Sequence, residues 1–165
     1  MNTTIVYYSL EGNCAYVAER IAEETGASLL RIEPEKAYPD SGFKKFFWGG
    51  KSAVMAEQPK LKPYTFDAGK TERVIFGFPV WAGTITPPLR SFIAENKTAL
   101  QGKKIAAFAC QSGAGAPKAL GKLKELLGIS ELEAELVLVD PKAKPNPDNE
   151  VQIAAFCEKL EALRR

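Results

Sequence analysis

Short runs of β-branched and aromatic residues recur along the chain, and most are followed by a segment whose apolar residues return every three or four positions. The β-branched and aromatic runs predict buried strands, and the apolar repeat of three or four positions predicts amphipathic helices. Strands are expected at 4–8, 28–32, 73–78, 104–109 and 132–139. Helices are expected from residue 14 to a closing glycine at 26, and over 43–55, 87–96, 117–127 and 147–163.

The alternation of strand and helix favours a parallel sheet with helices on both faces, because a crossover between parallel strands needs an intervening element. Such sheets bind ligands beyond the carboxyl ends of the strands, where the strand order reverses. The loops after the first, third and fourth strands are therefore the candidate site. A single α/β domain over residues 1–165 is expected, since no repeat or linker interrupts the pattern.

Composition narrows the chemistry that such a site can perform. The chain has no histidine, which excludes Ser-His-Asp triads, Cys-His pairs and imidazole metal sites. A bound cofactor is then the economical source of reactivity. The three cysteines are widely spaced and predict free thiols in a reducing, cytoplasmic setting. A net charge of +2 is too small to indicate nucleic-acid binding, and no apolar run is long enough to cross a membrane.

The first candidate loop reads Ser9-Leu10-Glu11-Gly12-Asn13 and continues into Cys14. It joins a buried strand to a helix N-terminus, where unpaired amides and the helix dipole favour an anion. Glycine and small polar residues let the backbone direct several N–H groups at one point. The alternative is an ordinary strand-to-helix turn in which Asn13 is the N-cap.

The other two loops supply a flat apolar ring and further amides. The second begins Pro79-Val80-Trp81-Ala82-Gly83-Thr84, and the third reads Cys110-Gln111-Ser112-Gly113-Ala114-Gly115. Trp81 offers a surface on which a planar ligand can stack, and Ala82 and Gly83 allow close approach of the backbone. The alternative for Trp81 is a residue that covers the core.

At these residues the sequence resembles the flavodoxin family, whose phosphate loop reads Ser/Thr-x-Thr-Gly-Asn-Thr directly after the first strand. The second loop is similar to the Pro-Val-Trp-x-Gly-x-x-x-Pro-Pro segment of a bacterial flavodoxin-like subgroup. The resemblance implies a three-layer flavodoxin-like fold of the short-chain type, with a five-stranded parallel sheet in the order 2-1-3-4-5, and FMN as cofactor. The implied FMN-binding residues are Ser9, Leu10, Glu11, Gly12, Asn13, Cys14, Pro79, Val80, Trp81, Ala82, Gly83, Thr84, Cys110, Gln111, Ser112, Gly113 and Gly115.

Three features depart from the family pattern. Glu11 and Cys14 replace threonines, and a carboxylate beside a phosphate is repulsive. We expect the Glu11 amide to stay in the loop while its side chain points to solvent, and the phosphate to be bound by amides alone. The third loop lacks the tyrosine that covers the second flavin face in many carriers. That face is either open or covered by Phe47 or Trp48, from this chain or a partner subunit.

Other patterns do not support competing functions. Cys14 and Arg20 have the Cys-x5-Arg spacing of cysteine phosphatases, but the residues between them predict a helix rather than a phosphate-binding loop. The strand ends lack the acidic residues of a response-regulator receiver, and no Gly-Lys-Ser/Thr marks a P-loop. The segment 141–147 is expected to be a stiff surface connection, with a docking role as the alternative.

Two functions fit an FMN site of this kind. The first is an electron carrier that serves redox partner proteins, which needs no catalytic side chain. The second is an NAD(P)H-dependent FMN reductase or quinone oxidoreductase acting on a small-molecule acceptor, favoured by an open flavin face and a basic pI of 8.4. A third hypothesis, suggested by Glu11 and Cys14, is that the chain is a flavodoxin-like binding module that has lost its flavin. The protein is expected to be a monomer or a homodimer.

Overall fold

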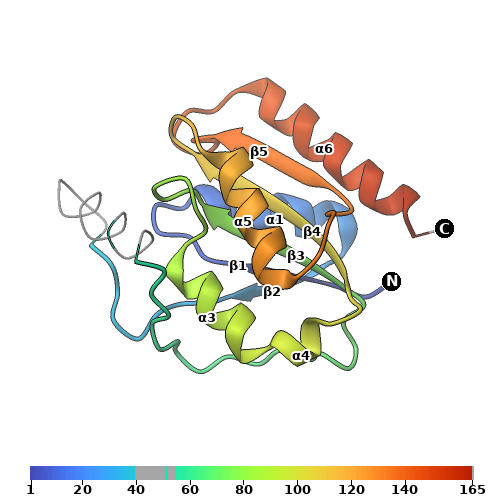
Figure 1. The fold of residues 1–165 in the computed structure, drawn as a ribbon. Coiled ribbons are helices and arrows are strands. Elements are labelled where there is room, and N and C mark those ends of the chain that lie inside the picture. The colour runs from blue at the N-terminus through green and yellow to red at the C-terminus, as the bar shows by residue number, and fades with distance from the viewer. Residues whose placement is uncertain (40–50, 52–54, 165) are drawn as a thin grey trace.

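A five-stranded parallel sheet lies at the centre of the molecule, with strands in the order β2-β1-β3-β4-β5 (Figure 1). The computed structural model describes residues 1–39, 51 and 55–164. The strands are β1 (Thr3–Tyr7), β2 (Ser28–Arg31), β3 (Arg73–Pro79), β4 (Lys104–Gln111) and β5 (Glu135–Val139). The helices are α1 (Asn13–Thr25), α3 (Pro87–Glu95), α4 (Lys97–Leu100), α5 (Ala116–Leu127) and α6 (Pro147–Ala162). The expected strand order and fold class are confirmed.

Helices cover both faces of the sheet and divide the core into two clusters. Figure 1 shows α3 and α5 in front of the sheet and α1 behind it. Side chains of α3 and α5 pack with one set of strand residues, including Phe76 and Phe78, in a buried cluster. Side chains of α1 and α6 pack with the other set, including Ile75 and Phe108. The alternation of Ile75 and Phe76 between clusters follows from the period of two along a strand.

The expected elements differ from the structure mainly at their ends. Most strand and helix limits agree within two residues, but β5 begins at Glu135 rather than at 132. Glu133, just before it, forms an ion pair with the buried Arg73, its Oε2 lying 2.7 Å from Nε of the arginine. The short helix α4 was not expected; Asn96 both ends α3 and precedes α4. Most of the helix expected at 43–55 lies outside the described residues.

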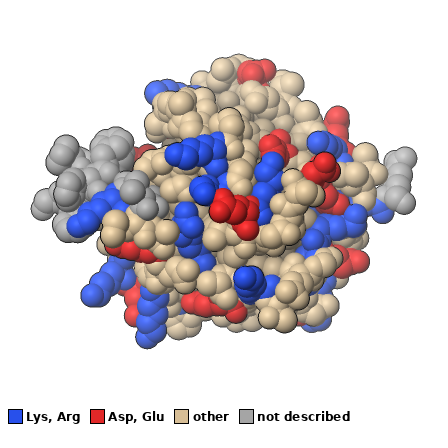
Figure 2. Space-filling model, in the orientation of Figure 1, with Lys and Arg blue, Asp and Glu red and all other residues tan. Residues whose placement is uncertain are grey.

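The charge pattern of the visible face agrees with the small net charge. Figure 2 shows Lys and Arg interspersed with Asp and Glu over this face, rather than gathered in a patch of one sign. No helix in the described part of the chain combines the length and apolar character needed to span a bilayer.

Gly77 in the middle of β3 lies under the ring of Phe108, its neighbour on β4. A Cβ atom at Gly77 would lie 2.1 Å from Phe108 Cζ, which is far inside van der Waals contact. Gly121 on α5 is the opposite case, since a Cβ there would have no heavy atom within 4 Å.

We therefore expect Gly77→Ala to lower the free energy of unfolding by about 1–3 kcal/mol, because a methyl group overpacks the core. Gly121→Ala is the control and should raise it by about 0.5–1 kcal/mol, because alanine favours a helix. Urea unfolding followed by circular dichroism measures both. Equal stability of Gly77→Ala and the parent would show that the ring is not held over β3.

Candidate functional site

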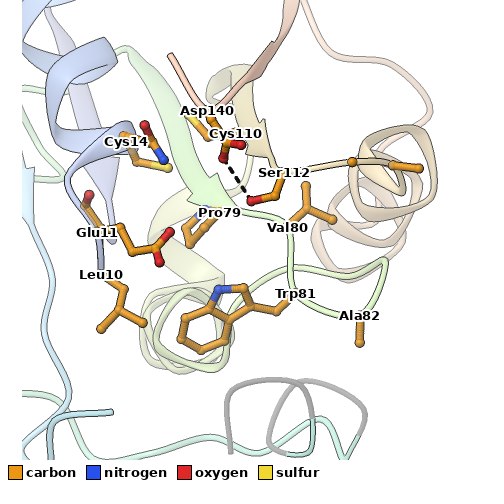
Figure 3. A pocket seen from close by; sticks show the side chains of 14 residues that line it. Leu10, Glu11, Cys14, Pro79, Val80, Trp81, Ala82, Cys110, Ser112 and Asp140 are labelled. Atoms are coloured by element: carbon orange, nitrogen blue, oxygen red, sulfur yellow. Dashed lines mark hydrogen bonds between the residues drawn. The ribbon is translucent and has the colours of Figure 1, made fainter. Parts of the chain in front are cut away.

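The three expected loops meet in one pocket at the carboxyl edge of the sheet (Figure 3). Its volume is about 230 Å³. The expected residues that line it are Ser9, Leu10, Glu11, Asn13, Cys14, Pro79, Val80, Trp81, Ala82, Cys110, Ser112 and Gly113. The remaining expected residues, Gly12, Gly83, Thr84, Gln111 and Gly115, lie in the same loops outside the lining. Ala114 and Asp140 also line it.

The first loop is shaped by a hydroxyl group and a glycine. Gly12 has a φ of 98° and precedes α1, so the N-cap position belongs to Gly12 and the reading of Asn13 as N-cap is wrong. The buried Ser9 hydroxyl accepts hydrogen bonds from the amides of Gly12 and Ala15, both at 3.2 Å. Ser9 thus satisfies two amides that the helix leaves unpaired.

Asn13 connects the first loop to a fourth segment of the chain. Its side chain is buried, and Oδ1 accepts hydrogen bonds from the amides of Lys142 at 2.9 Å and Ala143 at 3.2 Å. This joins the start of α1 to the loop between β5 and α6. No local pattern indicates this contact, because the partners are 129 and 130 positions apart.

Glu11 is exposed, yet its side chain lines the pocket. Figure 3 shows the carboxylate pointing into the pocket, toward Pro79. The expectation that it points away to solvent was therefore only partly correct. A carboxylate in this position brings negative charge to the mouth of the site.

The second loop closes on itself in a tight turn. Trp81 and Thr84 exchange both backbone hydrogen bonds, with N···O distances of 3.2 and 3.0 Å. Between them Ala82 and Gly83 have φ values of 50° and 70°, the left-handed pair required by a type I′ turn. Alanine adopts this conformation at a cost, so the turn stores some strain at the pocket rim. The guanidinium of Arg90, on α3, donates a hydrogen bond to the Thr84 hydroxyl at 2.8 Å.

The third loop packs directly against this turn. Gly115 has a φ of 105°, and a Cβ there would lie 3.0 Å from the Cα of Gly83. Gly83 and Gly115 thus bring two loops into close contact, although neither lines the pocket. Their contribution to the site is backbone geometry.

Trp81 is held by two tyrosines that the sequence did not single out. Its ring makes edge-on contacts with Tyr8, at a centroid distance of 5.7 Å, and with Tyr38, at 5.2 Å. Trp81 packs against the core cluster and also lines the pocket. Trp81 therefore covers the core, as the alternative interpretation had it, and its ring also lines the pocket; stacking on a planar ligand stays a prediction.

Polar side chains of the third loop are directed to neighbouring elements. Gln111 Oε1 accepts from the amide of Ala116 at 3.0 Å and so caps α5. The Ser112 hydroxyl donates to Asp140 Oδ1 at 2.8 Å (Figure 3), and the other carboxylate oxygen of Asp140 lies 3.0 Å from Lys144 Nζ. Asp140 comes directly after β5, so the rule that sites lie at strand ends could have found it.

The two thiols at the site, Cys14 and Cys110, are buried. Cys14 and Cys110 are hydrogen-bonded to each other, and burial raises the pKa of the Cys14 thiol well above its ordinary value. Arg20 lies away from Cys14, with Nη2 2.9 Å from Glu150 Oε2 on α6. The phosphatase reading is thereby rejected. Among the described residues, no group of three or more Cys, Asp and Glu side chains is placed to hold a metal ion.

The chain matches one family model and many solved structures of the same fold. The model described as Flavodoxin matches residues 2–144. No curated protein matches significantly. A flavoprotein from Lactobacillus acidophilus NCFM, solved in complex with FMN, is 19% identical, with a TM-score of 0.70 over 86% of this chain and 94% of that one.

Two further solved structures share the fold over nearly the whole chain. Oxidised flavodoxin 1 from Bacillus cereus is 15% identical, with a TM-score of 0.58 over 98% of both chains. A WrbA-like flavodoxin from Agrobacterium tumefaciens is 16% identical, with a TM-score of 0.61 over 99% of this chain and 97% of that one. At these identities the structures establish a shared fold.

Ser9→Ala removes the acceptor of the Gly12 and Ala15 amides. We expect it to lower the free energy of unfolding by about 1–2 kcal/mol, the range for losing a helix cap. Ser130→Ala, at an exposed loop position, is the matched control and should change stability by less than about 0.5 kcal/mol. Urea unfolding midpoints compare the two variants. Equal midpoints would show that Ser9 does not cap α1.

Proposed function

Since the chain belongs to the flavodoxin family, we propose that it binds FMN in the pocket between the loops after β1, β3 and β4 and transfers electrons by means of it. When bound, FMN supplies reversible one- and two-electron chemistry. The observation that supports this most directly is one pocket that joins the N-terminus of α1 to the ring of Trp81.

The first loop fits a phosphate group. The first amides of α1 lie at the positive end of the helix dipole, which favours an anion. Ser9 Oγ accepts two backbone N–H groups, so its own proton remains available to donate to a phosphate oxygen. Ser9 thus offers a hydroxyl donor to the phosphate, and Gly12 adds no side chain to the loop.

Trp81 fits the flavin ring. Its indole lines the pocket beside the first loop and is the only aromatic side chain among the described residues of the lining. Because Tyr8 and Tyr38 already fix its orientation, stacking on Trp81 costs little additional ordering.

An electron carrier is the function we favour, because electron transfer through a bound flavin needs no catalytic side chain. Histidine is absent, and Cys14 is buried with a raised pKa. Such a site binds and orients the cofactor, and the acceptor is a redox partner protein or a small molecule.

One observation favours an NAD(P)H-dependent reductase as the second candidate. Ser112, Gly113 and Ala114 are exposed and bring no ring to the pocket. A flavin bound against Trp81 would then keep one face accessible to a nicotinamide. Phe47 and Trp48, the aromatic residues suggested to cover that face, lie outside the described residues.

We expect Trp81→Ala to weaken FMN binding by about 1–3 kcal/mol, the range for losing one stacked aromatic side chain. Trp81→Phe keeps a ring and should lose much less. Quenching of FMN fluorescence on titration measures both dissociation constants, and urea unfolding checks that both variants are folded. An unchanged affinity of Trp81→Ala would place the flavin elsewhere.

Stopped-flow mixing of the FMN-loaded protein with NADH or NADPH distinguishes the two functions. A carrier is expected to show only slow loss of flavin absorbance, because it holds no site for the nicotinamide. Bleaching at a rate on the order of 1–1,000 s⁻¹, the range of ordinary turnover, would contradict the carrier and support the reductase.

A further inference from the structure

The loop between β5 and α6 brings a lysine to the first loop of the site. The Lys142 side chain lies over Gly12, close enough that a Cβ on this glycine would be 2.9 Å from Nζ and 3.2 Å from Cδ. Gly12 is the residue at which the chain turns into α1. The lysine amine is therefore beside the amides that begin this helix.

The position of Lys142 is fixed through its backbone. Asn13 Oδ1 accepts from the amides of Lys142 and Ala143, so the first loop itself holds the lysine-bearing segment. Farther along, the amide of Lys144 donates to the carbonyl of Asp140 at 2.7 Å and closes the turn. The segment 141–147, expected to be a plain surface connection, is thus attached to the site.

The charge of Lys142 is available to a ligand. Within the described part of the chain its amine makes no ion pair, in contrast to Lys144, whose Nζ lies 3.0 Å from Asp140 Oδ2. Glu11 adds a carboxylate to the lining of the same pocket. The backbone amides contribute dipoles but no net charge, so a lysine beside them would add a full positive charge to the binding of an anion.

We infer that Lys142 supplies the positive charge for the FMN phosphate, which makes the β5–α6 loop a fourth part of the site. This inference rests on the proposed binding of FMN. A phosphate monoester carries close to two negative charges at neutral pH, and lysine binds it as a point charge on a flexible stem.

The consequence is selectivity for phosphorylated flavin. Riboflavin has the same ring but no phosphate, so it should gain nothing from Lys142. The lysine therefore contributes to the affinity for FMN and not to stacking on Trp81.

The test compares Lys142→Gln with Lys159→Gln, which removes the same charge from an exposed position on α6 outside the pocket lining. Dissociation constants for FMN and for riboflavin are measured by fluorescence quenching at low and high KCl. We expect Lys142→Gln to weaken FMN binding by about five- to tenfold at low salt, in the range of one partly exposed charge-assisted contact. Riboflavin binding should be unchanged. Lys159→Gln should shift FMN affinity less than about twofold, and Lys142→Arg should retain most of the affinity.

The outcomes separate this inference from the proposed function. If the parent protein binds FMN and Lys142→Gln binds it equally well, the role of Lys142 is overturned while FMN binding stands. Equal weakening for FMN and riboflavin also overturns it, because the lysine would then act on the loop and not on the phosphate. A parent protein that takes up no FMN overturns both.

Discussion

The first amides of helix α1 have no carbonyl partners within their own helix. The loop before the helix is arranged so that other groups can accept from these amides. The Ser9 hydroxyl accepts from two backbone amides here, and the left-handed Gly12 turns the chain so that both reach it. The absence of a side chain at Gly12 leaves the space in which Lys142 lies. One glycine therefore serves both the turn into the helix and the approach of a cation.

The order of the strands brings the other parts of the site to these amides. Because β1 pairs with β3, and β3 with β4, the three loops emerge side by side at one edge of the sheet. The chain leaves β1 toward α1 on one face and leaves β3 toward α3 on the other (Figure 1). The pocket lies between the loops that make these two connections. Trp81, held by Tyr8 and Tyr38, forms one wall of it.

The sequence predicted what depends on local pattern. Strands such as β3 are continuous apolar runs, and a strand end followed by small residues locates a loop whose backbone can meet a ligand. Contacts between distant residues were not predictable in this way. Asn13 looked like a helix cap, but its carboxamide binds amides 129 and 130 positions away. Lys142 was missed for the same reason, since its loop lies near the site only in the folded chain. Asp140 was also missed, although it directly follows β5, where the rule for strand ends could have found it.

The direction of a side chain was equally hard to predict. Glu11 was expected to avoid the pocket because its charge opposes a phosphate, yet its carboxylate points into it. The backbone conformation of the loop sets the direction of this side chain, and the hydrophobic pattern of the sequence does not indicate it. Lys142, which we propose as a ligand of the phosphate, comes from a segment whose sequence suggested a stiff surface connection or a docking role.

Titration of the flavin-free protein with FMN tests the central claim most directly. If FMN binds in the pocket, its fluorescence is quenched to a sharp end point at one FMN per chain. The flavin absorption bands then shift as the ring enters an apolar site. A protein that leaves the fluorescence and the spectrum of FMN unchanged at every ratio would contradict it. The pocket at the start of α1 would then belong to a flavodoxin fold that holds no flavin.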